Sequence, residues 1–196
     1  MNKLRWLFGT FMVAAPDLAS GVALSSLMML LFAQPRIFLV LILNVVLGVF
    51  AAISPDLDLL IHVLVLKRPI SFDHRLRFHK PILIVLVWLV IAPFSVFYAT
   101  LVALCILAHF VDDSVGDAQE WGIQVFWPFS NKTVVFCSRK GGEFQLIRFY
   151  EPSQFAMPKH EDELDKYYLG LTIKNITTLT WGGVALLLLI VVFARL

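Results

Sequence analysis

The sequence predicts an all-α integral membrane protein with four to five transmembrane helices and a small cytoplasmic β-hairpin insertion. Two observations lead to this fold class. The chain of 196 residues is 59% hydrophobic and only 15% charged, with a mean hydropathy of +0.82, whereas soluble domains have about 45–50% apolar and about 25% charged residues. The apolar residues are also gathered into long runs, as lipid-facing helices require.

Composition also argues against several classes of protein. The net charge is only +2 and there is no basic block with interleaved aromatic residues, so the sequence predicts no nucleic-acid partner. Cys105 lies in an apolar run and Cys137 stands alone. The sequence therefore predicts neither a disulfide framework nor a cysteine-ligated zinc site.

Four apolar blocks can enter a membrane, and they cover residues 18–33, 37–53, 81–111 and 176–193. A hydrocarbon core of about 30 Å takes roughly 20 helical residues, so the first two blocks are short but sufficient. Residues 4–15 are expected to form an interfacial or partly inserted helix that leads into the first block. Its removal as a signal peptide is the less favoured alternative, because Pro16 obstructs the most obvious cleavage site.

The third block is too long for one straight span. At about 1.5 Å per residue it would reach roughly 46 Å, which exceeds the hydrocarbon core by half. Pro93 lies in its middle, and proline removes a helical hydrogen bond and kinks the chain. We therefore expect two helices, over about 81–92 and 96–111, folded as a hairpin. A single tilted and kinked helix is the alternative.

Positive charge predicts the orientation. Lys3 and Arg5 precede the first block, the linker 67–80 carries five basic residues, and the segment 112–175 carries seven. The turn between the first two blocks has only Arg36. Under the positive-inside rule, the amino terminus and both basic segments lie in the cytoplasm. The sequence therefore predicts a multi-pass protein of the bacterial inner membrane.

The segment 112–175 is the only substantial soluble part. Alternating β-branched and aromatic residues over 133–137 and 143–150 flank Gly141-Gly142, which is typical of a β-hairpin. We expect a membrane domain over 1–130, a cytoplasmic insertion with this hairpin over 131–175, and a C-terminal transmembrane helix over 176–196.

Ionisable residues gather beside the apolar blocks, where their cost makes them a hint of function. The groups are Asp17; Asp56 and Asp58; His74, Arg75 and His79; and His109, Asp112 and Asp113. If the hairpin returns the chain to the cytoplasmic side, these groups meet at one membrane face. A mixed imidazole and carboxylate set of this kind suits zinc, manganese or iron.

Each group has a simpler interpretation when taken alone. Asp56 and Asp58 are suited to start and cap a helix. His109 and Asp113 are spaced to form a hydrogen-bonded pair on one helix face, and Arg75 is suited to bind anionic headgroups. The prediction of a metal site therefore depends on the convergence of the groups.

The same residues form an ordered set of motifs over roughly 17–130. They are Pro55-Asp56-Leu57-Asp58, His74-Arg75 with His79, His109 with Asp113, Trp121-Gly122 and Trp127-Pro128. In order, spacing and apolar context, the set resembles the YdjM-like family, the LexA-regulated, membrane-bound predicted metal-dependent hydrolases. Two positions depart from the family pattern. Phe78-His79-Lys80 stands where the family usually has Thr-His-Ser, and Asp17 stands four residues before Gly21 where the family usually has histidine.

The convergence and the resemblance together imply a membrane-bound metal-dependent hydrolase. We expect a divalent metal ion, zinc before manganese or iron, with Arg75 and Asp112 as catalytic residues that bind phosphate and act as general base. The expected ligands are Asp56, Asp58, His74, His79, His109 and Asp113, with Asp17 as an outer partner or an extra ligand.

A site at headgroup level favours a phosphoester or lipid-like substrate, with membrane lipid as the partner. Two alternatives remain open. One is a non-catalytic membrane protein with a structural metal site, which has no open coordination position. The other is a small transporter, which would carry its ionisable groups near the bilayer midplane.

Overall fold

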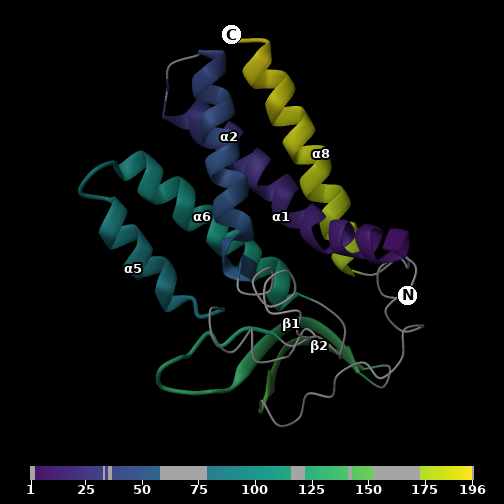
Figure 1. The fold of residues 1–196 in the computed structure, drawn as a ribbon. Coiled ribbons are helices and arrows are strands. Elements are labelled where there is room, and N and C mark those ends of the chain that lie inside the picture. Colours follow the sequence, from purple (N-terminus) through teal and green to yellow (C-terminus); the bar gives the residue numbers. More distant parts are fainter. Residues whose placement is uncertain are drawn as a thin grey trace. The chain divides into compact units, whose positions relative to one another are not determined.

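The computed structural model describes residues 3–32, 34, 37–57, 79–115, 122–140, 143–151 and 173–195 (Figure 1). The chain divides into two compact units, each described by itself. Unit 1 comprises Met1–Ser54, Ile84–His109 and Thr177–Leu196. Unit 2 comprises Pro55–Leu83 and Phe110–Ile176.

Unit 1 begins with a single long helix, α1 (Lys3–Leu31), which runs through Pro16. The sequence led us to expect an interfacial or partly inserted helix over 4–15 that leads into the first apolar block, and the structure joins the two as one continuous helix. Proline removes one backbone hydrogen bond from a helix. In apolar surroundings a full break would leave several more backbone groups unpaired, which explains why the helix continues.

Helix α1 crosses α2 (Phe38–Ile53) closely (Figure 1). This close approach of the two helices requires glycine at two positions. A Cβ added to Gly21 would lie 2.6 Å from the Cα of Val49, and one added to Gly48 would lie 2.8 Å from the Gly21 carbonyl oxygen. The Ser25 hydroxyl lies 2.9 Å from the Asn44 carbonyl oxygen on α2. Gly21 is therefore a packing residue of the crossing, one helical turn after Asp17.

Helices α5 (Ile82–Ile91) and α6 (Val96–Ser114) are separated by a short turn (Figure 1). The Trp88 indole nitrogen donates to the Thr100 hydroxyl at 3.4 Å, which places the two helices side by side. The predicted break near Pro93 and the helical hairpin are thus confirmed. Helix α6 extends three residues beyond the expected end at 111.

The apolar core of unit 1 draws on α1, α2, α6 and α8 (Ile173–Phe193). Its buried members are Met28, Met29, Leu41, Ala51, Ala52, Phe97, Leu101, Cys105 and Val192. Large apolar side chains on the outer faces stay exposed, including Leu43 of α2 and Leu187 of α8. Exposed apolar faces on tightly packed helices are what a lipid environment requires.

Three helical segments among the described residues are long and apolar enough to cross a membrane. They are Ala14–Leu31, Phe38–Asp56 and Val96–Ser114. Helix α5 and the segment Thr178–Phe193 of α8 are shorter apolar helices. The predicted fold class is therefore confirmed as mainly helical with one small sheet. The number of four to five spans, their orientation and the domain boundaries at 130 and 175 stay predictions.

Unit 2 contains the predicted hairpin, with β1 (Thr133–Lys140) antiparallel to β2 (Glu143–Tyr150). The register runs from Thr133 opposite Tyr150 to Lys140 opposite Glu143. Ile123 forms a bridge with Val134 on β1. Gly122 precedes it with φ +54°, and a Cβ there would lie 2.4 Å from the Val134 carbonyl oxygen. The glycine of the Trp121-Gly122 motif is therefore a structural requirement of this bridge.

Candidate metal centre

Three of the predicted ligands meet in unit 2. His79 is fully buried, and its Nε2 lies 3.3 Å from Asp56 Oδ1 and 3.0 Å from Asp113 Oδ2. Its ring also contacts the Phe110 ring at a centroid distance of 5.7 Å. Two carboxylates from separate parts of the chain thus approach one nitrogen of one buried imidazole.

Each of the three residues stands at the end of a helix. Asp56 closes the 3₁₀ turn Ser54–Asp56 that follows α2, and the Ser54 hydroxyl donates to the Ala51 carbonyl oxygen at 2.8 Å as α2 ends. Asp113 lies in the last turn of α6, and His79 lies three residues before α5. Helix ends supply polar backbone groups in an otherwise apolar chain, so ionisable side chains are tolerated there more easily than in mid-span.

The electrostatics of this group call for a cation. Two carboxylates that are close together and shielded from water repel each other strongly unless positive charge lies near them. A protonated His79 or a divalent metal ion could supply that charge. One ligand atom from each of Asp56, His79 and Asp113 lies within 4.8 Å of the others, so the three residues could hold a metal ion. Carboxylate and imidazole ligands fit the predicted zinc, manganese or iron, and they do not identify which.

A second buried pair lies in unit 1. The Nδ1 atom of His109 on α6 is 2.9 Å from Asp17 Oδ1 on α1, and both residues are buried. Because an ionised carboxylate can only accept, the His109 Nδ1–H donates to Asp17. This arrangement leaves Nε2 as the second, basic nitrogen of the ring. Proteins usually orient a metal-binding imidazole in this way, with a carboxylate that accepts a hydrogen bond from the ring nitrogen that does not bind the metal.

Helix α6 links the two groups along the chain. His109 and Asp113 are four residues apart on it, so they project from one helix face. Asp112 is also buried, but it does not belong to the group of potential metal ligands within unit 2. The structure therefore brings together Asp56, His79 and Asp113 in one unit and Asp17 with His109 in the other.

Removing the carboxylate behind His109 should weaken metal binding without abolishing it. We expect Asp17→Ala to lower metal affinity about 10- to 100-fold, the range typical of outer-shell partners. Asp17→Asn should remain closer to wild type, because its amide oxygen can still accept from Nδ1–H. Titration of the metal-free protein with Zn²⁺ or Mn²⁺ measures both affinities. Unchanged affinity in Asp17→Ala would show that the pair has no part in metal binding.

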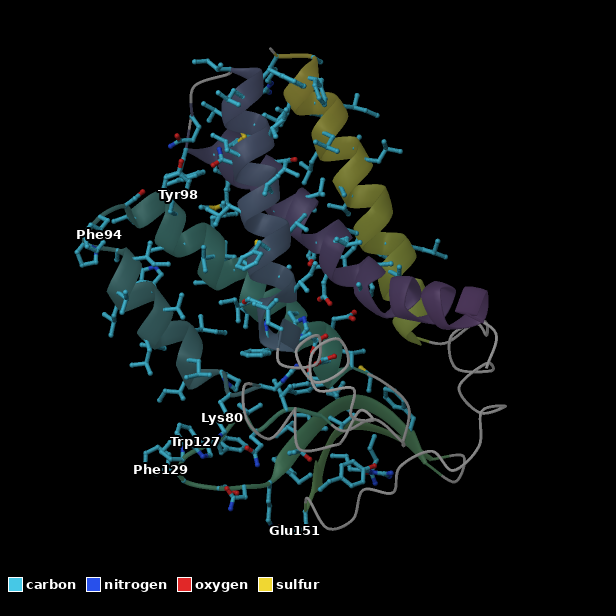
Figure 2. The ribbon with its side chains drawn as sticks, in the orientation of Figure 1. Lys80, Phe94, Tyr98, Trp127, Phe129 and Glu151 are labelled. Atoms are coloured by element: carbon cyan, nitrogen blue, oxygen red, sulfur yellow. The ribbon has the colours of Figure 1, made fainter. Side chains whose placement is uncertain are left out.

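Several predicted site residues lie outside the described part of the chain. They are Asp58, His74 and Arg75. Sequence reasoning also missed one contact next to the site. The Lys80 ammonium lies 4.1 Å from the centroid of the Trp127 ring, and Figure 2 shows the two side chains together. The sequence showed that Lys80 directly follows the candidate ligand His79, but nothing in it indicated that Lys80 would contact Trp127.

The motifs and the apolar helices agree with comparison against known families. A model of the family described as YdjM inner membrane protein matches residues 12–195, nearly the whole chain. No curated protein and no solved structure gives a significant match.

Proposed function

Because the chain belongs to the YdjM inner membrane protein family, we propose that it is a metal-dependent hydrolase acting on a phosphoester at the membrane face. The substrate class is a lipid or another amphiphile, and the site faces the cytoplasm. Support comes from the buried acidic and imidazole groups, from their positions at the ends of apolar helices, and from the basic segments on either side of the third apolar block.

The observation that carries the proposal is the contact of two carboxylates with one buried imidazole nitrogen. Asp56 and Asp113 approach His79 Nε2 at 3.3 and 3.0 Å. A buried histidine in a merely structural role needs one acceptor for a ring N–H. Two acidic side chains on the same nitrogen concentrate negative charge, and a divalent ion among them balances it.

The residues that would hold the metal are Asp56, His79 and Asp113, with His109 as a fourth ligand. His109 is assigned because it precedes Asp113 by one turn on α6 and because Asp17 fixes its other nitrogen. Asp58 and His74 are assigned from the sequence to complete one or two metal positions. When bound, the metal would polarise a phosphoryl oxygen and increase the acidity of a water.

The remaining residues serve the substrate. The Arg75 guanidinium is planar and can donate to two phosphate oxygens at once, so it would orient the phosphoester and stabilise negative charge that develops on it. Asp112 is a buried carboxylate outside the ligand group, and it would accept the proton of the attacking water as general base. A position at headgroup level would admit an amphiphile with its tail left in the bilayer.

A matched pair of variants tests the phosphate role. Arg75→Lys keeps the charge but loses the planar fork, so activity on a phosphoester panel should fall about 100-fold, the lower range for loss of one preorganised donor. Metal content, measured by elemental analysis of the purified protein, should not change. Arg77→Lys is the control and should be nearly silent, because a headgroup anchor requires only charge.

Two results would contradict the proposal. Equal tolerance of lysine at positions 75 and 77 would make Arg75 an ordinary membrane anchor. A metal-loaded wild-type protein that hydrolyses no phosphoester, ester or amide would favour a structural metal site instead.

A further inference from the structure

An exposed aromatic turn precedes β1 in unit 2. Phe129 is 93% exposed and Phe126 is 49% exposed, and Trp127 lies between them, partly buried. We call Phe126, Trp127 and Phe129 the aromatic turn. Figure 2 shows Phe129 pointing outward close to Trp127. Three large aromatic side chains in four residues are a costly surface to present to water.

The aromatic turn is held in place by its own contacts. The Trp127 N–H donates to the Gln124 carbonyl oxygen at 3.2 Å, and the Phe129 N–H donates to the Phe126 carbonyl oxygen at 2.8 Å. The Phe126 ring also contacts the Phe149 ring on β2 at 6.2 Å. The exposed side chains are therefore displayed by a bonded turn, and presenting them to a partner requires little further ordering.

Lys80 connects the aromatic turn to an apolar helix. Its ammonium lies over the Trp127 ring at 4.1 Å, and both residues belong to unit 2. Only Pro81 separates Lys80 from the first residue of α5, an apolar helix with no buried residue. Two residues of chain span at most about 7 Å, so Lys80 lies within about this distance of the first residue of α5.

We propose that the aromatic turn and Lys80 form a docking surface for anionic phospholipid headgroups. Tryptophan is enriched at the headgroup level of membranes because its ring is apolar and its indole N–H is polar. Phe129 and Phe126 insert below the headgroups, and the Lys80 ammonium binds lipid phosphate. The short chain connection from Lys80 to α5, an apolar helix with no buried residue, favours lipid over a protein partner. The surface depends on membrane insertion and not on the proposed hydrolase activity.

Depth-dependent quenching in lipid nanodiscs tests the docking surface. The full chain with Cys105→Ala and Cys137→Ser carries one added cysteine with an environment-sensitive fluorophore, either Phe129→Cys or the control Glu151→Cys. Glu151 is an exposed residue of the same unit, with a side chain that is 51% exposed. We expect label 129 to be quenched severalfold more by a nitroxide on the lipid headgroup than by aqueous iodide. Label 151 should show the reverse.

A comparison of two lipids tests whether the docking surface prefers an anionic headgroup. With the nitroxide on phosphatidylglycerol, label 129 should be quenched more strongly than with the nitroxide on phosphatidylcholine. Lys80→Gln should remove this difference while leaving metal content unchanged. Iodide quenching of label 129 equal to that of label 151 would overturn the docking surface. Protection of label 129 from both quenchers would indicate a protein contact and would overturn it equally. No preference for phosphatidylglycerol in the unaltered Lys80 protein would overturn the binding of anionic headgroups.

Discussion

Replacing His79 by alanine should sharply weaken the binding of a divalent metal ion to the purified protein. Its Nε2 is the atom on which Asp56 and Asp113 converge, so the change removes one ligand and leaves a partly exposed and a buried carboxylate close to each other. We expect metal affinity to fall by more than about 100-fold, beyond the range for outer-shell partners. Elemental analysis after purification and titration with Zn²⁺ or Mn²⁺ measure the loss.

His160→Ala is the matched control for this prediction. His160 belongs to none of the motifs assigned to the site, and it lies outside the described part of the chain. Its replacement should leave metal content unchanged. If wild-type protein binds no metal and His79→Ala only lowers thermal stability, then His79 is a structural partner of the two carboxylates. Removing one partner of such a buried pair typically costs about 3–5 kcal/mol.

Replacing Gly21 by alanine should destabilise the protein through the crossing of α1 and α2. The added Cβ would meet three backbone atoms of α2, at 2.6, 2.7 and 2.9 Å. Backbone atoms cannot rotate away as a side chain can, so the helices must separate. Overpacking of this kind costs about 1–3 kcal/mol or more, and each kcal/mol lowers Tm by roughly 2–4 °C at this size. Thermal unfolding in detergent measures the shift.

Gly183→Ala provides the same chemical change without the collision. An added Cβ on Gly183 of α8 meets nothing within 4 Å among the described residues. Alanine is favoured over glycine in a helix by up to about 1 kcal/mol, so this variant should be neutral or slightly more stable. A Tm drop in Gly183→Ala as large as in Gly21→Ala would show that the close crossing is not the cause.

Features that depend on neighbouring residues could be predicted from the sequence. Pro93 in an overlong apolar run predicted the break between α5 and α6, because proline acts on its own turn of helix. Gly141-Gly142 between two alternating segments predicted the β-hairpin, because a turn is likewise determined by the residues within it. Pro16 does not end its helix, since α1 continues through it. Local propensity was outweighed there by the cost of unpaired backbone groups in apolar surroundings.

Contacts between distant residues were harder to predict. The sequence placed Asp17 near the site as an outer partner or an extra ligand, but it could not say that the side chain bonds to His109, 92 residues away. That contact depends on how α1 packs beside α6. The contact of Lys80 with Trp127 likewise depends on a turn whose path no local pattern determines. The roles of Asp58, His74 and Arg75 stay predictions from the sequence.

The turn between α5 and α6 has a consequence for how deeply the hairpin enters lipid. Helix α5 has 10 residues, which is about 15 Å. Val96–Ser114 of α6 is long and apolar enough to cross a membrane. Helix α5 is shorter than a hydrocarbon core of about 30 Å, so with its first residue at one surface the turn would lie inside the bilayer.

Backbone at that depth must satisfy its own donors. Ala92 donates to the Trp88 carbonyl oxygen, and Phe94 and Ser95 both donate to that of Ile91. Pro93 has no N–H to satisfy. The Phe94 side chain, 88% exposed, points away from the helices (Figure 2), where acyl chains can surround it. Each backbone N–H between Ala92 and Ser95 is thus paired, so this turn can lie in lipid without the cost of an unpaired donor.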